Sequence, residues 1–66
     1  MNSKPALSIH ATDEQTVDFA RSLATPELAD WHSQQEAGAA KAPRAEDRAT
    51  HARGASIARQ ELQRRA

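Results

Sequence analysis

The stretch TDEQTVDFARSLATPELADW, residues 12–31, contains the two helix starts that decide the fold. Its first four residues, TDEQ, match a capping box, in which the threonine hydroxyl accepts from the backbone three residues on and the glutamine side chain reaches back. Farther along, Thr25-Pro26-Glu27 opens a second helix with Thr25 as its cap, because proline is tolerated at the first helical position and an acidic side chain suits the positive end of the helix dipole. The sequence therefore predicts two consecutive capped helices.

The apolar side chains of these helices fall on one side. At about 100° per residue, Val17, Phe19 and Leu23 share one arc of the first helix. In the second helix, Leu28 and Trp31 are neighbours at i, i+3 spacing, and polar residues follow them, so we expect only one turn of it to pack well. We expect Trp31 either to close a small cluster with the apolar residues of both helices or to anchor a partner protein, since tryptophan is enriched among residues that dominate binding energy.

Residues 6–10, ahead of the first helix, alternate apolar and polar side chains. Leu7 and Ile9 fall on one side of an extended chain, and Ser8 and His10 fall on the other, which is the period of a β-strand. A lone strand must pair with another. Since the sequence holds no second strand signal, this strand would pair with a second copy, as a homodimer, or with another partner. The alternative is a flexible N-terminal arm.

The segment after residue 43 is charged and rich in alanine. It contains strong helix formers, but Gly54 in its middle costs about 1 kcal/mol relative to alanine, so the sequence predicts one helix, two half-helices or a disordered tail. Ile57 and Leu62 lie on different sides of a continuous helix, which leaves no apolar stripe to dock it on the first two helices. We therefore predict that a partner orders this segment and contacts these two side chains.

Large apolar side chains are scarce, because Leu, Ile, Val and Phe supply only eight of the 66 residues. Such a share is typical of chains that do not fold alone, and a chain this short buries only about 60% of its unfolded surface. We predict a mainly α-helical chain that is partly folded in isolation. Its parts are an arm or short strand over residues 1–11, a helical hairpin-like segment over 12–42, and a basic, partner-ordered helical tail over 43–66.

Charge is divided unevenly along a chain whose formal net charge is zero. Residues 1–40 hold two cations and six anions, a net −4, whereas residues 41–66 hold seven cations and three anions, a net +4. Arg44, Arg48 and Arg59 fall within about 60° of one another on a continuous helix and form a basic stripe. This asymmetry predicts an acidic partner for the second half, either nucleic acid or protein. The alternative is that the two halves attract each other.

The side chains that carry chemistry are few and far apart. The histidines His10, His32 and His51 lie about twenty residues from one another. His32 with Glu36, and His51 with Asp47, supply two ligands each, fewer than a zinc site needs. There is no cysteine and no glycine-rich phosphate loop, and so small a core cannot enclose the water-poor pocket that catalysis requires. We therefore expect no catalytic site, no metal and no cofactor.

Two features of the sequence indicate the cellular compartment of the protein. The lack of cysteine is typical of a reducing compartment. The first residues hold too few apolar side chains for an export signal or a membrane span. The sequence thus predicts a cytoplasmic protein without membrane contact.

The order of a short alternating segment, a capped helix, a second helix and a charged tail resembles the antitoxins of bacterial type II toxin–antitoxin modules. For the ribbon-helix-helix type, the resemblance implies that Ser8 and His10 face the DNA groove from a strand shared by two chains, and that the tail engages the toxin. The chain is also similar to the small antitoxins that neutralise ParE-type toxins, since Trp31 is followed, after eleven residues, by Pro43-Arg44, like their helix, break and tail.

Our leading hypothesis from the sequence is a non-enzymatic antitoxin that neutralises a larger, toxin-like protein by folding against it, with regulation of its own expression as an added role. Contacts with the protein partner are expected from Leu28, Trp31, Ile57 and Leu62. Contacts with nucleic acid or an acidic partner are expected from Ser8, His10, Arg44, Arg48 and Arg59. The alternative is a small dimeric nucleic-acid-binding transcriptional regulator that lays its basic stripe along phosphates.

Overall fold

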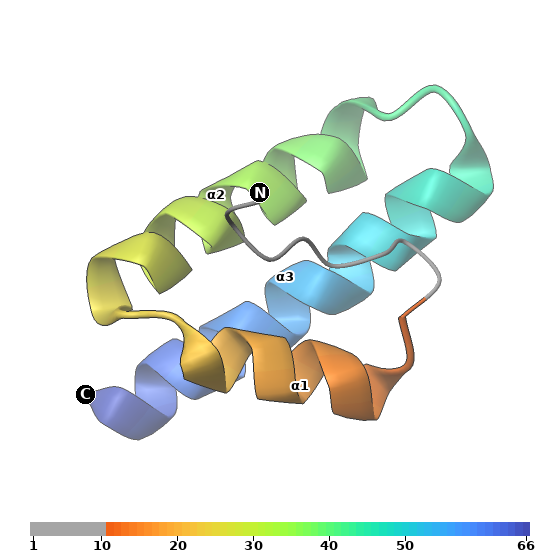
Figure 1. Cartoon of the computed structure of the whole chain (residues 1–66). Coiled ribbons are helices and arrows are strands. Elements are labelled where there is room, and N and C mark those ends of the chain that lie inside the picture. The colour runs from red at the N-terminus through yellow and green to blue at the C-terminus, as the bar shows by residue number, and fades with distance from the viewer. Residues whose placement is uncertain (1–10) are drawn as a thin grey trace, which may run out of the picture.

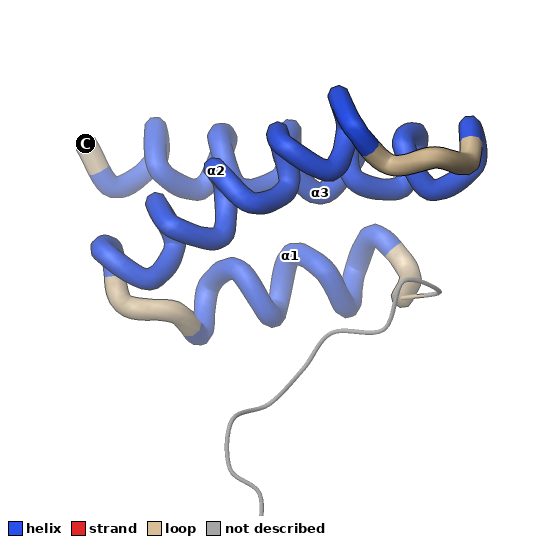
Figure 2. Tube along the Cα trace, turned by 90° about the horizontal axis from the view of Figure 1, so that it is seen from above, coloured by secondary structure: helices blue, strands red, loops and turns tan. Residues whose placement is uncertain are grey.

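The computed structural model describes residues 11–66, and over that range the chain forms three helices and no strand. They are α1 (Asp13–Ser22), α2 (Thr25–Lys41) and α3 (Ala45–Arg65). In Figure 1, α2 and α3 run side by side in opposite directions, and α1 lies against α3. Figure 2 shows α1 on one side of the α2–α3 pair. The mainly α-helical fold class is confirmed, and the strand predicted at residues 6–10 lies outside the described residues.

The start of α1 is the capping box that the sequence predicts. The backbone N–H of Gln15 donates to Thr12 Oγ1 over 3.1 Å, and the N–H of Thr12 donates to Gln15 Oε1 over 2.9 Å. Two backbone donors at the helix end are therefore satisfied by side chains. The acidic residues Asp13 and Glu14 occupy the first turn, where the helix dipole favours negative charge.

The second helix begins where predicted, but its cap differs. Ala24 is the N-cap residue, and its backbone N–H donates to Oε1 of Glu27 over 3.0 Å. Thr25 already lies inside the helix, so the prediction that its hydroxyl caps α2 is wrong. The Thr25 hydroxyl instead accepts from Nη1 of Arg65 over 3.1 Å, at the far end of the chain. Its role is thus a contact between helices.

Two glycines allow α2 and α3 to approach closely. A Cβ built on Gly38 would lie 2.5 Å from Cγ of His51, and one built on Gly54 would lie 2.9 Å from Oε1 of Gln35. Atoms of the facing helix therefore fill the space that a side chain would take at both positions. The same His51 and Gln35 are joined across the interface, with Nδ1 and Oε1 2.9 Å apart. The absence of a Cβ at these two positions thus leaves room for the His51 and Gln35 side chains between the helices.

This packing corrects two expectations. Gly54 does not divide the C-terminal segment, because α3 continues through it from Ala45 to Arg65. Nor is α2 limited to one packed turn, since Gln35 and Gly38 face α3 beyond Trp31. Polar and small residues make these contacts, and a pattern of large apolar residues does not reveal them.

A small cluster lies between the three helices. Ala20 of α1, Leu28 of α2 and Ala58 of α3 are fully buried, and four half-buried side chains pack against them. These are Leu23, Trp31, Ile57 and Leu62. The expectation that Ile57 and Leu62 have no contacts within the chain is wrong. Because α3 packs against both α1 and α2, a wider face of it is covered than a single neighbouring helix would cover.

Candidate functional site

Near its C-terminal end, α3 carries a carboxylate surrounded by arginines. The Glu61 side chain is only 6% exposed. Its oxygens accept from Arg64 over 2.5 and 3.0 Å and from Arg65 over 3.0 Å, and Arg21 of α1 lies 3.6 Å away. The hydrogen bond with Arg64, above all, lowers the pKa of Glu61 from 4.5 to about 2, although partial burial acts against this. Glu61 is therefore held ionised.

Arg65 connects this charged cluster to α1 and α2. Its Nη2 donates to the backbone carbonyls of Ala20 and Arg21 over 3.3 Å each, which are carbonyls at the C-terminal end of α1. Its Nη1 bonds to Thr25 at the start of α2. A cation at this end of a helix is favoured by the dipole. The cluster thus ties the three helices together, and we assign it a structural role.

The sequence analysis did not predict the Glu61 cluster. The signal was present in part, because Glu61 precedes Arg64 and Arg65 at the i, i+3 and i, i+4 spacings that bring side chains together on a helix. The contacts with Arg21, Thr25 and the α1 carbonyls span 40 to 45 residues of sequence. No local pattern indicates them.

The predicted basic stripe is not assembled as one cationic surface. Nη1 of Arg48 donates to the carbonyls of Ala42 and Pro43, over 2.8 and 3.2 Å, and so covers the end of α2. Arg44 is paired with Glu46 of its own helix over 2.6 Å. Arg59 lines a groove between α2 and α3.

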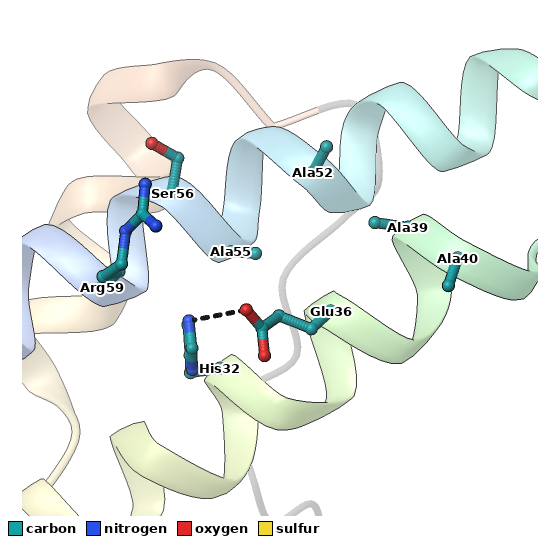
Figure 3. A pocket seen from close by; sticks show the side chains of 8 residues that line it. All are labelled: His32, Glu36, Ala39, Ala40, Ala52, Ala55, Ser56 and Arg59. Atoms are coloured by element: carbon teal, nitrogen blue, oxygen red, sulfur yellow. Dashed lines mark ion pairs between the residues drawn. The ribbon is translucent and has the colours of Figure 1, made fainter.

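That groove lies between α2 and α3 and holds about 430 Å³. Four alanines and four polar residues of the two helices line it, as Figure 3 shows. Between the helices, His32 Nε2 lies 3.5 Å from Glu36 Oε2. Ser56 and Arg59 belong to α3. We call this surface the alanine groove, after its lining residues Ala39, Ala40, Ala52 and Ala55.

A second groove, of about 440 Å³, lies between α1 and α2. Phe19, Leu23 and Trp31 give it an apolar lining, and all three are half-buried. The rings of Phe19 and Trp31 meet edge to face with centroids 5.2 Å apart. The carboxylates of Glu27 and Asp30 line the same groove. We call this surface the aromatic groove.

The residues predicted to contact a protein partner occupy different places. Leu28 is fully buried in the chain's own cluster, and Ile57 and Leu62 pack against that cluster. Trp31 lines a surface groove. The sequence analysis assigned Phe19 to the core alone and missed its place beside Trp31 on the surface. Ser8 and His10 lie outside the described residues.

The histidines of the described range are engaged in pairs. His32 contacts Glu36, as its spacing suggests, whereas His51 bonds to Gln35 on α2 instead of to Asp47. In residues 11–66, no three His, Asp or Glu side chains gather where they could hold a metal ion. None of the helices in this range has the length and apolar character to cross a membrane.

Comparison with known proteins gives no relative: the chain matches no protein-family model, no curated protein and no solved structure. What the chain does must therefore follow from its own residues.

Proposed function

We propose that this chain is a protein-binding module, of the antitoxin class, that holds an apolar side chain of a larger partner in its aromatic groove. One observation carries the proposal. The sequence has only two aromatic side chains, Phe19 and Trp31, and both remain half-buried on one surface when the helices pack. In a chain with so few large apolar residues, leaving both of them accessible favours a role at an interface, where tryptophan contributes strongly to binding.

The charge around this groove indicates the chemistry of the partner. Glu27 and Asp30 stand at the aromatic groove, and Asp30 forms no ion pair with any residue in the range 11–66. A partner that inserts an apolar side chain into the aromatic groove should therefore carry a lysine or arginine next to that side chain, facing these carboxylates. Opposite charges across an interface raise the association rate and fix the register of the two surfaces.

The assignment to the antitoxin class rests on the order of segments, a capped helix, a second helix and a charged C-terminal part. The competing function, a nucleic-acid-binding regulator, has less support. Its basic stripe needs Arg44, Arg48 and Arg59 together, and two of these three guanidinium groups already bond within the chain.

The test is a titration of the chain with the product of the adjacent reading frame, followed by the fluorescence of Trp31, which is the only tryptophan. Binding should shift its emission to shorter wavelength, because the partner removes water from the indole. Asp30→Lys should weaken the affinity by at least about tenfold. Asp18→Lys makes the same charge change at an exposed position of α1 that is outside its first turn and outside the groove lining, and should change the affinity by less than about twofold.

Equal effects of the two lysine variants, or no binding of that product at micromolar concentrations, would contradict the proposed site. A parallel titration with duplex DNA addresses the competing function. Binding to DNA that weakens steeply with salt and is lost in Arg59→Glu would favour the regulator instead.

A further inference from the structure

The aromatic groove combines an apolar lining with negative charge that its own lining does not balance. It is formed by the second half of α1 and the first half of α2, and among the described residues that line it none is lysine or arginine. The Glu27 carboxylate accepts from the backbone N–H of Ala24, and Asp30 forms no ion pair within residues 11–66. An occupant that complements this groove must therefore offer apolar side chains and a positive charge together.

The sequence ahead of α1 offers both. Residues 4–9, which we call the N-terminal segment, contain Lys4, Leu7 and Ile9, and residues 1–11 hold no acidic side chain. Leu7 and Ile9 are two residues apart, so an extended chain presents them on the same side. Pro5 restricts Lys4 to extended backbone. The chain thus carries, close to the groove in sequence, a segment with the chemistry that the groove requires.

The lengths of the two elements also match. Suppose that the chain before Thr12 turns back and runs beside α1 in the opposite direction. Phe19 lies seven residues beyond Thr12 on the helix, roughly 10 Å away, and Ile9 lies three extended residues before it, also roughly 10 Å away. Leu23 and Leu7 are likewise both roughly 16 Å from Thr12. The two apolar side chains of the segment therefore fall level with the two α1 side chains of the groove.

We propose that the N-terminal segment occupies the aromatic groove of its own chain. Its two apolar side chains lie against the rings, and its lysine, three residues farther toward the start of α2, faces the two carboxylates. A short tether supplies an effective concentration in the millimolar range, roughly 1 mM, which a second copy or a free peptide does not have. A partner must displace the segment before it binds. This displacement rests on the proposed function, whereas the docking itself does not.

The experiment attaches a nitroxide label to the segment of the full chain and maps which backbone amide signals it broadens. The sequence has no cysteine, so Ser8→Cys provides a single attachment point, on the opposite side of the extended segment from Leu7 and Ile9. The amides of Leu23 and Trp31 should broaden most. The amide of Ala55, which lines the alanine groove, should broaden little.

Two sets of substitutions test the contacts. Replacing Leu7 and Ile9 together with serine should abolish the local broadening. Lys4→Glu places like charges together and should lower the docking equilibrium by at least about threefold. Lys41→Glu makes the same charge change at an exposed position that lines neither groove, and should leave the pattern unchanged. Circular dichroism establishes that each variant keeps its helices.

Three outcomes would overturn the docking. They are uniform broadening, broadening at Ala55 that equals that at Trp31, and a pattern that the serine variant retains. Mixing nitroxide-labelled chain with isotope-labelled chain that lacks the nitroxide tests the remaining source. Broadening in that mixture would assign the groove to the segment of a second copy, and would overturn the docking within one chain.

These measurements need no partner, so they test the docking even if the proposed function is wrong. In the titration with the product of the adjacent reading frame, the serine variant should bind at least about twofold more tightly, because a larger fraction of its grooves is open. An unchanged affinity, with the docking observed, would overturn the displacement alone. A product that binds neither chain would contradict the proposed function and leave the docking standing.

Discussion

Replacing Gly38 with alanine tests whether α2 and α3 pack as closely as the structure has them. At an open helix position this change stabilises a protein by about 0.5–1 kcal/mol, because glycine loses the most backbone freedom on folding. At Gly38, however, the new Cβ would lie 2.5 Å from Cγ and 2.6 Å from Cδ2 of His51. Carbon atoms attract best at about 3.5–4.0 Å. The new Cβ would therefore overlap the His51 ring, and either the ring or the helix backbone must move.

The His51 ring has little freedom to move. Its Cγ is attached directly to Cβ, so turning the ring about its own axis does not displace that atom. A change at χ1, or separation of the helices, breaks the 2.9 Å contact between His51 Nδ1 and Gln35 Oε1. Overpacking costs about 1–3 kcal/mol and a lost hydrogen bond about 0.5–1.5 kcal/mol. Taking the middle of each range and subtracting the gain in helix propensity, we expect a net loss of roughly 2 kcal/mol in the free energy of unfolding.

The assay is thermal denaturation followed by circular dichroism, on the wild type, Gly38→Ala, His51→Ala and the double variant. In a domain of this size, about 1 kcal/mol shifts Tm by about 4–8 °C, so Gly38→Ala should lower Tm by at least about 4 °C. In the His51→Ala background the obstructing ring is absent, and the same change should raise Tm. Gly54→Ala is the comparison, because its Cβ meets the flexible end of Gln35, which can turn aside. Turning it aside gives up the same contact with His51, which the gain in helix propensity offsets, so the effect should be close to zero.

The reasoning is refuted if Gly38→Ala raises Tm equally with and without the His51 ring. That outcome would mean that the two helices are farther apart than the structure has them, and that glycine is present at this position for another reason.

Three further predictions concern the cap, the core and the charged cluster. Thr12→Ala removes the hydroxyl that caps α1 and should reduce stability by about 1 kcal/mol; an unchanged urea midpoint would show that α1 does not depend on its capping box. Leu28→Ala truncates the largest fully buried side chain of residues 11–66 and should cost about 2–5 kcal/mol, enough to remove the cooperative thermal transition, whereas a retained transition would place the core elsewhere. The pKa of Glu61 is lowered in the folded chain from 4.5 to about 2, so its contribution to stability is complete above pH 4.5 and is lost as the pH falls toward 2. Denaturant titrations at pH 7, 4 and 2.5 should show this loss in the wild type and not in Glu61→Gln, and parallel pH profiles would contradict it.

Local signals in the sequence are enough to predict how the first two helices begin. The TDEQ capping box needs only atoms within four residues, and the structure contains both of its hydrogen bonds. At Thr25 the local pattern is ambiguous, because a threonine followed by proline and glutamate fits two registers. Glu27 caps α2 through the Ala24 backbone, and the Thr25 hydroxyl is left for Arg65, a contact that no nearby residue indicates.

Packing between distant segments is what the sequence does not reveal. Gly54 weakens the prediction of a continuous helix in the linear sequence, but in the structure both Gly54 and Gly38 lie where a side chain of the facing helix comes close. Ile57 and Leu62 do not form a stripe for one neighbouring helix. They are nevertheless covered, because α3 lies against two helices. The prediction of an undocked tail failed because it assumed a single docking face.

Folding changes what the uneven charge of the sequence implies about the charge of a partner. The C-terminal part has a net charge of +4 in sequence, which predicts an acidic partner. In the structure, Arg53 pairs with Asp13 of α1 over 3.5 Å, and Arg65 bonds to the α1 carbonyls, so part of this positive charge is used within the chain. The accessible acidic side chains at the aromatic groove then indicate a basic partner there, while the alanine groove keeps one charge of each sign. A charge reversal at Asp30 should therefore weaken the binding of a basic partner and leave the packing of the three helices unchanged, because Asp30 is exposed.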